Sequence, residues 1–215
     1  MKRITMASVA LILLLAGTIG CYAQQHSYKL TRGKVTSTVQ WTEQDNGNGK
    51  TITIEPFPGK SYVQKVDARH RTTEWHFTCK SEETDVKITL RDGTYSISGL
   101  HKGKKVEKSV KSNGKPWYQN ISYASEHLLK KEGEVLTYEC FRPDNLDFNT
   151  MTATHVGKEE LNGINTDKIR INPTGRFAKM WSCHYFIDPA RELMICYKAV
   201  EGMPGTPLTT WMLIK

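Results

Sequence analysis

The sequence predicts a mainly β protein: a curved antiparallel sheet, or an unclosed β-barrel, of about 10 strands with one short helix. Three observations favour this fold class. Apolar and polar residues alternate with a period of two along most of the chain, turn signals recur at short intervals, and only one segment has a helical pattern. A sheet that covers a core with one of its faces accounts for this alternation.

Residues 1–23 predict a secretory signal peptide. Lys2 and Arg3 supply a positive start, residues 4–16 form an apolar stretch, and the small residue Ala23 precedes Gln24. We expect cleavage between Ala23 and Gln24, and export to the periplasm or to a position associated with the outer membrane.

Cys21 offers a second processing site. It follows Gly20, so a lipoprotein peptidase could cut there and leave an acylated cysteine that anchors the protein in a membrane. A lipoprotein signal favours an aliphatic residue three positions before the cysteine, and Thr18 occupies that position here. Soluble export is therefore the preferred prediction, and lipidation at Cys21 is the alternative.

Residues 49–215 are expected to form a single β domain, which is long enough to bury a core. Residues 24–48 are expected to be a loosely ordered segment with a first strand, because the polar, glycine-containing run at residues 45–49 interrupts any regular element. No stretch after the signal reaches the ~18 apolar residues of a transmembrane helix.

The chain carries a formal net charge of +8. A protein outside the cytoplasm does not meet nucleic acid, so this charge favours lipid, lipoprotein or anionic glycan as partners, or serves solubility alone. A basic patch is predicted from five lysines: Lys102, Lys104, Lys105, Lys108 and Lys111. The patch is a candidate site for anionic lipid or polysaccharide. The alternative is a solvated strand pair whose lysines discourage edge-to-edge aggregation.

A three-strand meander is predicted between residues 72 and 100. The Asp-Gly pair at residues 92–93 favours a two-residue hairpin, which pairs Ile88 with Ile97. A four-residue turn at residues 81–84 brings a third strand onto the same apolar face and sets Phe77 opposite Ile88. The meander therefore covers a core on one side only.

The C-terminal half predicts two further hairpins and a closing strand. The Asn-Gly pair at residues 162–163 has the same turn chemistry and sets Lys158 opposite Asp167. A type I turn is expected at residues 188–191, with proline at its favoured position. The strands predicted in the rest of the chain cover residues 51–54, 61–66, 181–187, 192–199 and 208–214.

One helix is predicted, over residues 123–131. Ser122 is its expected N-cap, Lys130 and Lys131 fall in its last turn, and Gly133 follows its end. We expect this helix to cover one side of the curved sheet.

The cysteines after the signal are Cys79, Cys140, Cys183 and Cys196. The turn at residues 188–191 would place Cys183 opposite Cys196, at a site where Cα atoms approach to about 4.5 Å, so these two are the disulfide candidate. The alternative is a pair of reduced thiols, because a different loop length shifts the register. Cys79 lies on the apolar face of the meander and is expected to be a buried thiol.

No catalytic or metal-binding motif stands out. The sequence lacks a glycine-rich phosphate loop, a nucleophile elbow and a zinc-protease motif. His76 and Cys79 are three residues apart on a predicted strand and point to opposite faces, so they cannot share a metal ion. Trp117 and Tyr118 would suit stacking on a sugar, although aromatic residues of a small β domain more often belong to its core. We therefore expect neither catalytic residues nor a cofactor.

Four segments carry a resemblance to known proteins: "RDGTYSISG", "KPWYQNI", "VGKEELNGINTDKIRI" and "YFIDPARELMICYKAVEGMPGTP". Together they resemble small exported β proteins of the Bacteroides group, within uncharacterised families similar to the LolA/LolB lipoprotein-carrier architecture. The resemblance covers residues 75–215. It implies an unclosed β-barrel whose concave apolar face, partly covered by a helix, can shelter acyl chains, and it implies no catalytic residues. The expected function is non-enzymatic binding of an amphipathic or lipid-like ligand; the alternative is an interaction protein that binds acidic glycans or protein partners through basic strands.

Overall fold

Fourteen antiparallel strands form one continuous sheet in the computed structural model, which describes residues 23–124, 128–175, 181–200 and 206–214. The first eight strands are β1 (Ala23–Arg32), β2 (Val35–Asp45), β3 (Gly49–Phe57), β4 (Lys60–Asp67), β5 (Thr72–Cys79), β6 (Thr84–Arg91), β7 (Thr94–His101) and β8 (Lys104–Lys111). The other six are β9 (Val135–Arg142), β10 (Asp147–Leu161), β11 (Ile164–Pro173), β12 (Cys183–Asp188), β13 (Leu193–Val200) and β14 (Leu208–Leu213). Two short 3₁₀ turns accompany them, η1 (Lys80–Glu82) and η2 (Ile121–Tyr123). The predicted mainly β fold with one unclosed antiparallel sheet is confirmed, whereas the predicted number of about 10 strands is too low.

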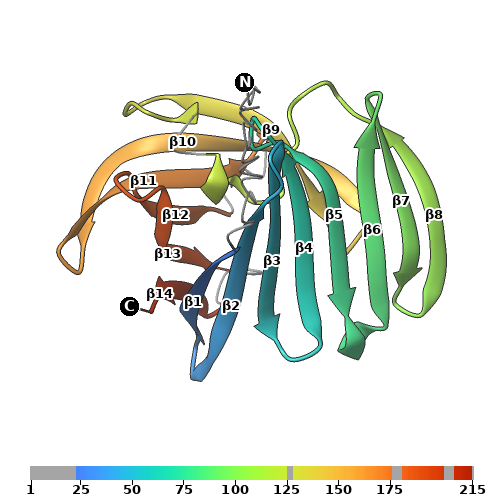
Figure 1. Cartoon of the computed structure of the whole chain (residues 1–215), viewed down its shortest axis with the longest axis horizontal. Helices are drawn as coiled ribbons and strands as arrows, with labels where there is room; N and C mark the ends of the chain where they lie inside the picture. The colour runs from blue at the N-terminus through green and yellow to red at the C-terminus, as the bar shows by residue number, and fades with distance from the viewer. Residues whose placement is uncertain (1–22, 125–127, 176–180, 201–205, 215) are drawn as a thin grey trace, which may run out of the picture.

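The strands follow one another around the sheet in chain order, with one exception (Figure 1). Strands β1 to β8 form one meander and β9 to β14 form another. The exception is the pairing of the first strand with the last, which runs from Tyr28 opposite Leu213 to Arg32 opposite Thr209. The outermost strands are therefore β8 and β9. Residues 112–134, termed the crossing segment, connect these two strands, so the sheet has its break where the chain passes from one meander to the other.

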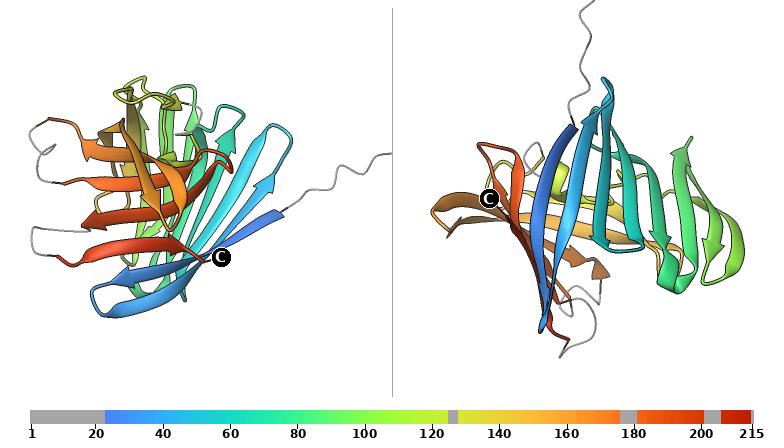
Figure 2. Two further views of the ribbon diagram at one scale, coloured as in Figure 1. Left: turned by 90° about the vertical axis from the view of Figure 1, so that its left-hand side faces the viewer. Right: turned by 60° about the horizontal axis from the view of Figure 1, so that its bottom comes forward.

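The two meanders run in different directions, so the sheet wraps around an interior (Figures 1 and 2). The turn of the β9–β10 hairpin reaches the inner face of β5 to β8. There the ring of Phe148 stacks on that of Tyr95, with centroids 3.7 Å apart. The ammonium group of Lys108 donates to the carbonyl oxygen of Leu146 at 3.1 Å. The second meander thus covers the first from the inside.

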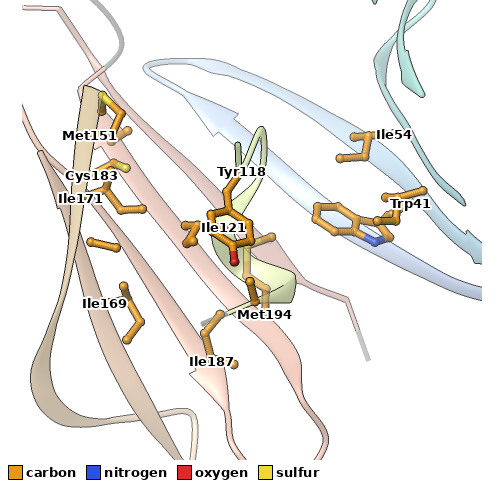
Figure 3. Close-up of a cluster of buried hydrophobic side chains, with 14 of the residues drawn as sticks. Trp41, Ile54, Tyr118, Ile121, Met151, Ile169, Ile171, Cys183, Ile187 and Met194 are labelled. Atoms are coloured by element: carbon orange, nitrogen blue, oxygen red, sulfur yellow. The ribbon is translucent and has the colours of Figure 1, made fainter. Parts of the chain in front are cut away.

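Two groups of buried side chains fill this interior. The larger lies between β1–β4 and β9–β14 and includes Tyr118 and Ile121 of the crossing segment, which stand between the two meanders in Figure 3. The smaller includes Trp75, Tyr95 and Phe141, where the β9–β10 hairpin meets β5–β8. Tyr118 and Ile121 of the crossing segment therefore occupy the concave side of the sheet.

The N-terminal part is more regular than expected. Residues 24–48 were predicted to be a loosely ordered segment with a first strand, but they contain most of β1 and all of β2. The polar run at residues 45–49 affects only the connection between β2 and β3. Both strands have a neighbour on each side, and their inward residues Tyr28 and Trp41 are buried. Hydrogen bonds to both neighbours fix the strands despite their polar composition.

The predicted meander between residues 72 and 100 forms, and the hairpin at residues 92–93 has the expected register. The turn before it differs, because Phe77 lies opposite Val86 and not opposite Ile88. The connection consists of η1 and Glu83, whose backbone is in the left-handed region (φ 46°). A shift of two residues keeps every side chain on its predicted face, so the apolar face is preserved.

The predicted pairing of Cys183 with Cys196 is wrong. Cys183 lies opposite Ala199, and Cys196 lies opposite Phe186. The connection after β12 is longer than the assumed turn, because Glu192 adopts the left-handed region (φ 51°) and the ladder is irregular after Phe186. The two cysteines consequently point to opposite faces of the sheet, and no disulfide joins them.

The helix predicted over residues 123–131 lies partly outside the described residues. Residues 121–123 form η2, and its N-cap is Asn120, whose side-chain oxygen accepts from the amide of Ser122 at 3.0 Å. Residues 125–127 lie outside the described residues. Leu128 is helical, and its amide donates to the carbonyl oxygen of Ala124 at 3.0 Å, whereas residues 129–131 are not helical. Among the residues that the structure describes, no helix is long and apolar enough to cross a membrane. The predicted signal peptide and Cys21 lie outside the described residues, which begin at Ala23.

Candidate functional site

The crossing segment seals the open edge of β9, beside the break in the sheet, with backbone hydrogen bonds. Trp117 forms a parallel bridge with Glu139 of β9. The amide of Glu139 donates to the carbonyl oxygen of Pro116 at 2.9 Å, and the amide of Thr72 donates to the carbonyl oxygen of Trp117 at 2.8 Å. One short stretch of chain therefore joins the start of β5 to the middle of β9.

The side chain of Gln119 continues this seal. Its amide group makes the two hydrogen bonds that a residue of a neighbouring strand would make. Oε1 accepts from the backbone N–H of Phe141 at 3.0 Å, and Nε2 donates to the Phe141 carbonyl at 3.0 Å. Oε1 also accepts from the indole N–H of Trp117 at 3.0 Å. The buried backbone of β9 is thereby paired where no neighbouring strand exists.

The carboxylate of Glu139 collects three donors at the same place. It accepts from the hydroxyl of Tyr95 at 2.7 Å, from the hydroxyl of Ser112 at 2.6 Å and from the amide of Asn113 at 3.3 Å. Glu139 is 4% exposed, so these donors replace water around its oxygens. Burial and the hydrogen bond to Glu139 raise the pKa of Tyr95 above its usual value, and the phenol stays protonated. The arrangement joins β7, the crossing segment and β9, and we interpret it as structural.

The outer side of this seal forms one wall of a groove of about 950 Å³, termed the basic-rimmed groove. Its apolar lining consists of Leu90, Pro116, Trp117, Tyr118, Leu128 and Leu136. Its cationic lining consists of Arg69, Arg71 and Lys115. The β4–β5 connection and the crossing segment supply these cations from either side, and Leu128 is exposed to solvent. The groove therefore combines an apolar surface with a positive rim.

One acidic residue lies among these cations, and it is already neutralised. Asp67 forms an ion pair with Arg71 at 2.7 Å. Burial alone would raise the pKa of Asp67, but hydrogen bonds from the Arg71 side chain and from the amides of Arg71 and Arg69 hold it below its usual value. Arg69 and Lys115 then give the rim its positive charge.

A second pocket, of about 830 Å³ and termed the side pocket, opens where β1 separates from β14. Its aliphatic lining consists of Ile164, Leu193, Ile195, Met212, Leu213 and Ile214. Charges of both signs surround it, including Glu43 paired with Lys50 at 3.2 Å. This pocket is lined by Gln24, at the predicted start of the mature chain.

The predicted basic patch does not form one surface. Val106 and Val110 pack toward the smaller core group, so Lys104 and Lys108 share their side of β8. The remaining members face the other side or lie in the turn: Lys102, Lys105 and Lys111. The ammonium groups of Lys102 and Lys108 bond backbone carbonyls of the β9–β10 connection. These lysines are therefore divided between the inward side of the edge strand β8, its outer side and the turn before it.

Trp117 and Tyr118 belong to the core, at 1% and 3% exposure, and offer no platform for a sugar. Two of the thiols are unreactive, because burial raises the pKa of Cys140 to about 12 and that of Cys196 to about 11. Cys79 is buried, as expected. Among the described residues, no group of three His, Cys, Asp or Glu side chains could hold a metal ion.

Sequence reasoning missed the groove residues Arg69 and Arg71. A signal existed in the run of basic residues at 69–71, between two predicted strands. It gave no indication of the partner wall, because Lys115 is more than forty positions away in the chain. Only the path of the crossing segment brings the two cationic stretches to the same groove.

No protein-family model matches this chain, and no curated protein matches it. The fold is similar to a solved structure, a β-barrel-like protein of the domain of unknown function DUF1849 from Brucella abortus, with a TM-score of 0.60 and 10% sequence identity. The alignment covers 91% of this chain and 96% of that chain. This likeness shows a shared fold and supports the expectation of a β-rich domain without known function. It does not bear on the Bacteroides-type or lipoprotein-carrier part of the resemblance.

Proposed function

We propose that this protein is a non-enzymatic component of the cell envelope that binds an amphipathic, lipid-like ligand with an acidic headgroup in the basic-rimmed groove. The observation that carries the proposal is the apolar lining of the groove directly beside Arg69 and Lys115. The volume of about 950 Å³ lies within the range of small-molecule sites, roughly 300–1,000 Å³. The predicted signal peptide supports a place of action outside the cytoplasm.

The two parts of the groove suit the two parts of such a ligand. An acyl chain would lie against Leu90, Leu128 and Leu136, where each buried methylene contributes about 0.8 kcal/mol. The headgroup would meet the rim cations at the open mouth, where water reduces the strength of each contact. Chain length should therefore determine affinity, and headgroup charge should determine selectivity.

The groove differs in place from the site that the resemblance implies. A carrier of the expected kind would hold acyl chains on the concave face of its sheet. Here Tyr118 and Ile121 of the crossing segment already fill that face. The basic-rimmed groove is lined by the same segment and by the β4–β5 connection, and it offers apolar surface at Leu90, Leu128 and Leu136.

Displacement of a fluorescent fatty acid by oleate or by lysophosphatidylglycerol tests the proposal. Leu128→Asp should weaken binding about tenfold, because it places a charge on the apolar lining. Arg69→Glu with Lys115→Glu should weaken binding of the acidic probe and spare a neutral monoacylglycerol. Lys105→Glu, on the outer face of β8, makes a matched control and should bind like the unaltered protein. Failure of every probe to bind, or equal binding by Leu128→Asp and the control, would overturn the proposal.

The proposed location has its own test. The intact mass of the protein recovered from its cell envelope should match a chain that begins at Gln24. Acyl mass on Cys21 would establish the anchored alternative and leave the groove unaffected. A chain that keeps residues 1–20 would contradict export.

A further inference from the structure

The outer face of the second meander carries a row of polar side chains that crosses the strands. Strands β10 to β14 lie side by side and continue into β1 and β2 (Figure 2). Ile171, Cys183 and Ala199 face the larger core group, so the residue before each of them in the same strand, or after it, points outward. The register aligns one outward residue from each strand, and this set is termed the outer row: Thr154, Arg170, His184, Lys198, Thr210, Thr31 and Thr36.

The centre of the outer row is positively charged and has no acid within the row. Neighbouring strands lie about 4.8 Å apart, so Arg170 and Lys198 flank His184 at this spacing. Basic residues directly opposite one another destabilise a sheet when both are charged. The carboxylate of Glu159 also acts on His184, but Lys168 already pairs with it at 2.7 Å. Positive charge therefore remains in excess at this place.

The outer face of the first meander shows the opposite arrangement. There His76 pairs with Asp85 of the neighbouring strand at 2.6 Å. Glu74 pairs with Lys65 at 3.1 Å and with Lys87 at 3.0 Å, so one acid serves the strands on both sides. A surface that serves solubility alone has both signs interspersed in this way. The unmatched centre of the outer row is therefore particular to the second meander.

The ring of Phe186 orients two of the cations. The ammonium groups of Lys168 and Lys198 lie 5.3 Å and 4.8 Å from its centroid. Phe186 is itself buried, so it forms a floor beneath these flexible side chains. Cations that are held in place lose less conformational freedom when they bind an anion.

His184 responds to the excess of positive charge. Burial and the charges of Lys168, Arg170 and Lys198 hold the pKa of His184 below its ordinary value, although Glu159 acts in the opposite direction. The imidazole is therefore neutral near pH 7, with one nitrogen that donates and one that accepts. An anion bound beside it would raise this pKa.

We propose that the outer row binds a linear acidic polysaccharide, which lies across the strands with carboxylate groups against Arg170 and Lys198. The guanidinium group of Arg170 suits a carboxylate because it can donate two parallel hydrogen bonds. The threonines on either side of the cations offer hydroxyl groups that can donate to and accept from sugar hydroxyls.

The shape of the outer row favours a polymer over a membrane surface. A membrane-binding face combines cations with exposed apolar side chains that enter the lipid, whereas threonines flank the cations here. The row also continues over β1 and β2 through Thr31 and Thr36, so it offers a track rather than a single anion site. This site is separate from the basic-rimmed groove and does not depend on the function proposed for it.

Fluorescence polarisation with a labelled short oligogalacturonate tests the proposal. Half-saturation should lie below about 1 mM at low salt and rise with ionic strength. The methyl ester of the same oligomer keeps the sugar hydroxyls without the charges and should bind about tenfold more weakly. Arg170→Glu with Lys198→Glu should weaken binding of the acid form about tenfold. Lys105→Glu with Lys111→Glu, on the outer side of β8, makes the same change in net charge and should bind like the unaltered protein.

A second measurement keeps the test decisive if the Arg170 and Lys198 variant perturbs the fold. In the unaltered protein, the pKa of His184 followed by NMR should rise on saturation with the oligogalacturonate and stay unchanged with the methyl ester. His184→Asn identifies the signal. No binding at about 1 mM, equal binding by the two double variants, or an unchanged pKa of His184 would overturn the proposal. Phosphatidylglycerol vesicles that bind through Arg170 and Lys198 when the oligogalacturonate does not would assign the row to a membrane surface and exclude the polysaccharide.

Discussion

The sheet has two discontinuities, and the chain treats them differently. Along β9 the crossing segment takes the place of a neighbouring strand, because Trp117 and Gln119 pair with its backbone. Between the start of β1 and the start of β13 no described segment does so, and a pocket of about 830 Å³ remains. Unpaired backbone N–H and C=O groups cost free energy at a buried strand edge, whereas water can pair with them at a solvated edge. The backbone at the edge of β9 is therefore paired, whereas the backbone at the start of β1 stays accessible.

Loss of the Glu139 carboxylate should have the largest effect on this comparison. Glu139→Ala leaves the buried hydroxyl of Tyr95 and the hydroxyl of Ser112 without their acceptor. We expect the free energy of unfolding in urea to fall by about 3 kcal/mol. Glu139→Gln keeps an acceptor oxygen and should lose about 1 kcal/mol. Equal losses for the two variants would show that the seal does not depend on these hydrogen bonds.

The side chain of Gln119 should matter next. Gln119→Ala removes both bonds to the backbone of Phe141 and leaves the indole N–H of Trp117 without its acceptor. We expect a loss of about 2 kcal/mol by the same measurement, together with faster exchange of the Phe141 amide. Lys115→Ala lies in the same segment, and its effect should stay within about 0.5 kcal/mol. A similar stability for both variants would contradict the strand-like role of Gln119.

The lysines of β8 should affect association more than stability. Lys104→Val with Lys108→Val makes the inward positions of this edge continuously apolar. We expect the apparent mass in size-exclusion chromatography with light scattering to rise at high protein concentration. Lys29→Val is the control, because β1 has partners on both sides at that residue. An unchanged mass for the β8 variant would mean that another feature protects this edge.

The smallest expected effect is a loss of stability at low pH. It arises in the β4–β5 connection, which forms one wall of the basic-rimmed groove. The folded-state pKa of Asp67 is lower than its unfolded value of about 3.9, so Asp67 stabilises the fold above that pH and loses its contribution below it. Asp67→Asn should be less stable than the unaltered protein by about 0.5 kcal/mol near neutrality. The difference should vanish once the pH lies below the folded-state pKa of Asp67. A difference that persists there would exclude the Asp67–Arg71 ion pair as its cause.

The local turns were predictable from the sequence, but the pairing of β1 with β14 and the path of the crossing segment were not. The Asp-Gly pair at residues 92–93 fixes its hairpin because both central residues take positive φ, 48° at Asp92 and 70° at Gly93. Registers failed where a glutamate adopts the left-handed region, as Glu83 and Glu192 do, since glutamate gives no composition signal for such a turn. These errors explain the displaced Cys183–Cys196 pair.

The candidate sites were beyond sequence reasoning for a different reason. The seal unites Thr72, Tyr95, Trp117 and Glu139, which lie on four separate parts of the chain. No periodicity relates such positions, because hairpin arguments fix neighbours and leave long connections free. The positive charge and the lysines of β8 were visible in the sequence, but their division between two faces required the path of the β9–β10 hairpin.

The pairing of β1 with β14 has a consequence for how the protein acquires its fold. Tyr28 and Leu213 lie at opposite ends of the chain, so the ladder that joins the two meanders cannot form until the last strand has been synthesised and, if the chain is exported, has crossed the membrane. Until then β1 presents a bare edge along its whole length. Contacts of such large sequence separation slow folding. We expect refolding from urea to show an early phase within each meander and a slow final phase, in which the first and last strands meet.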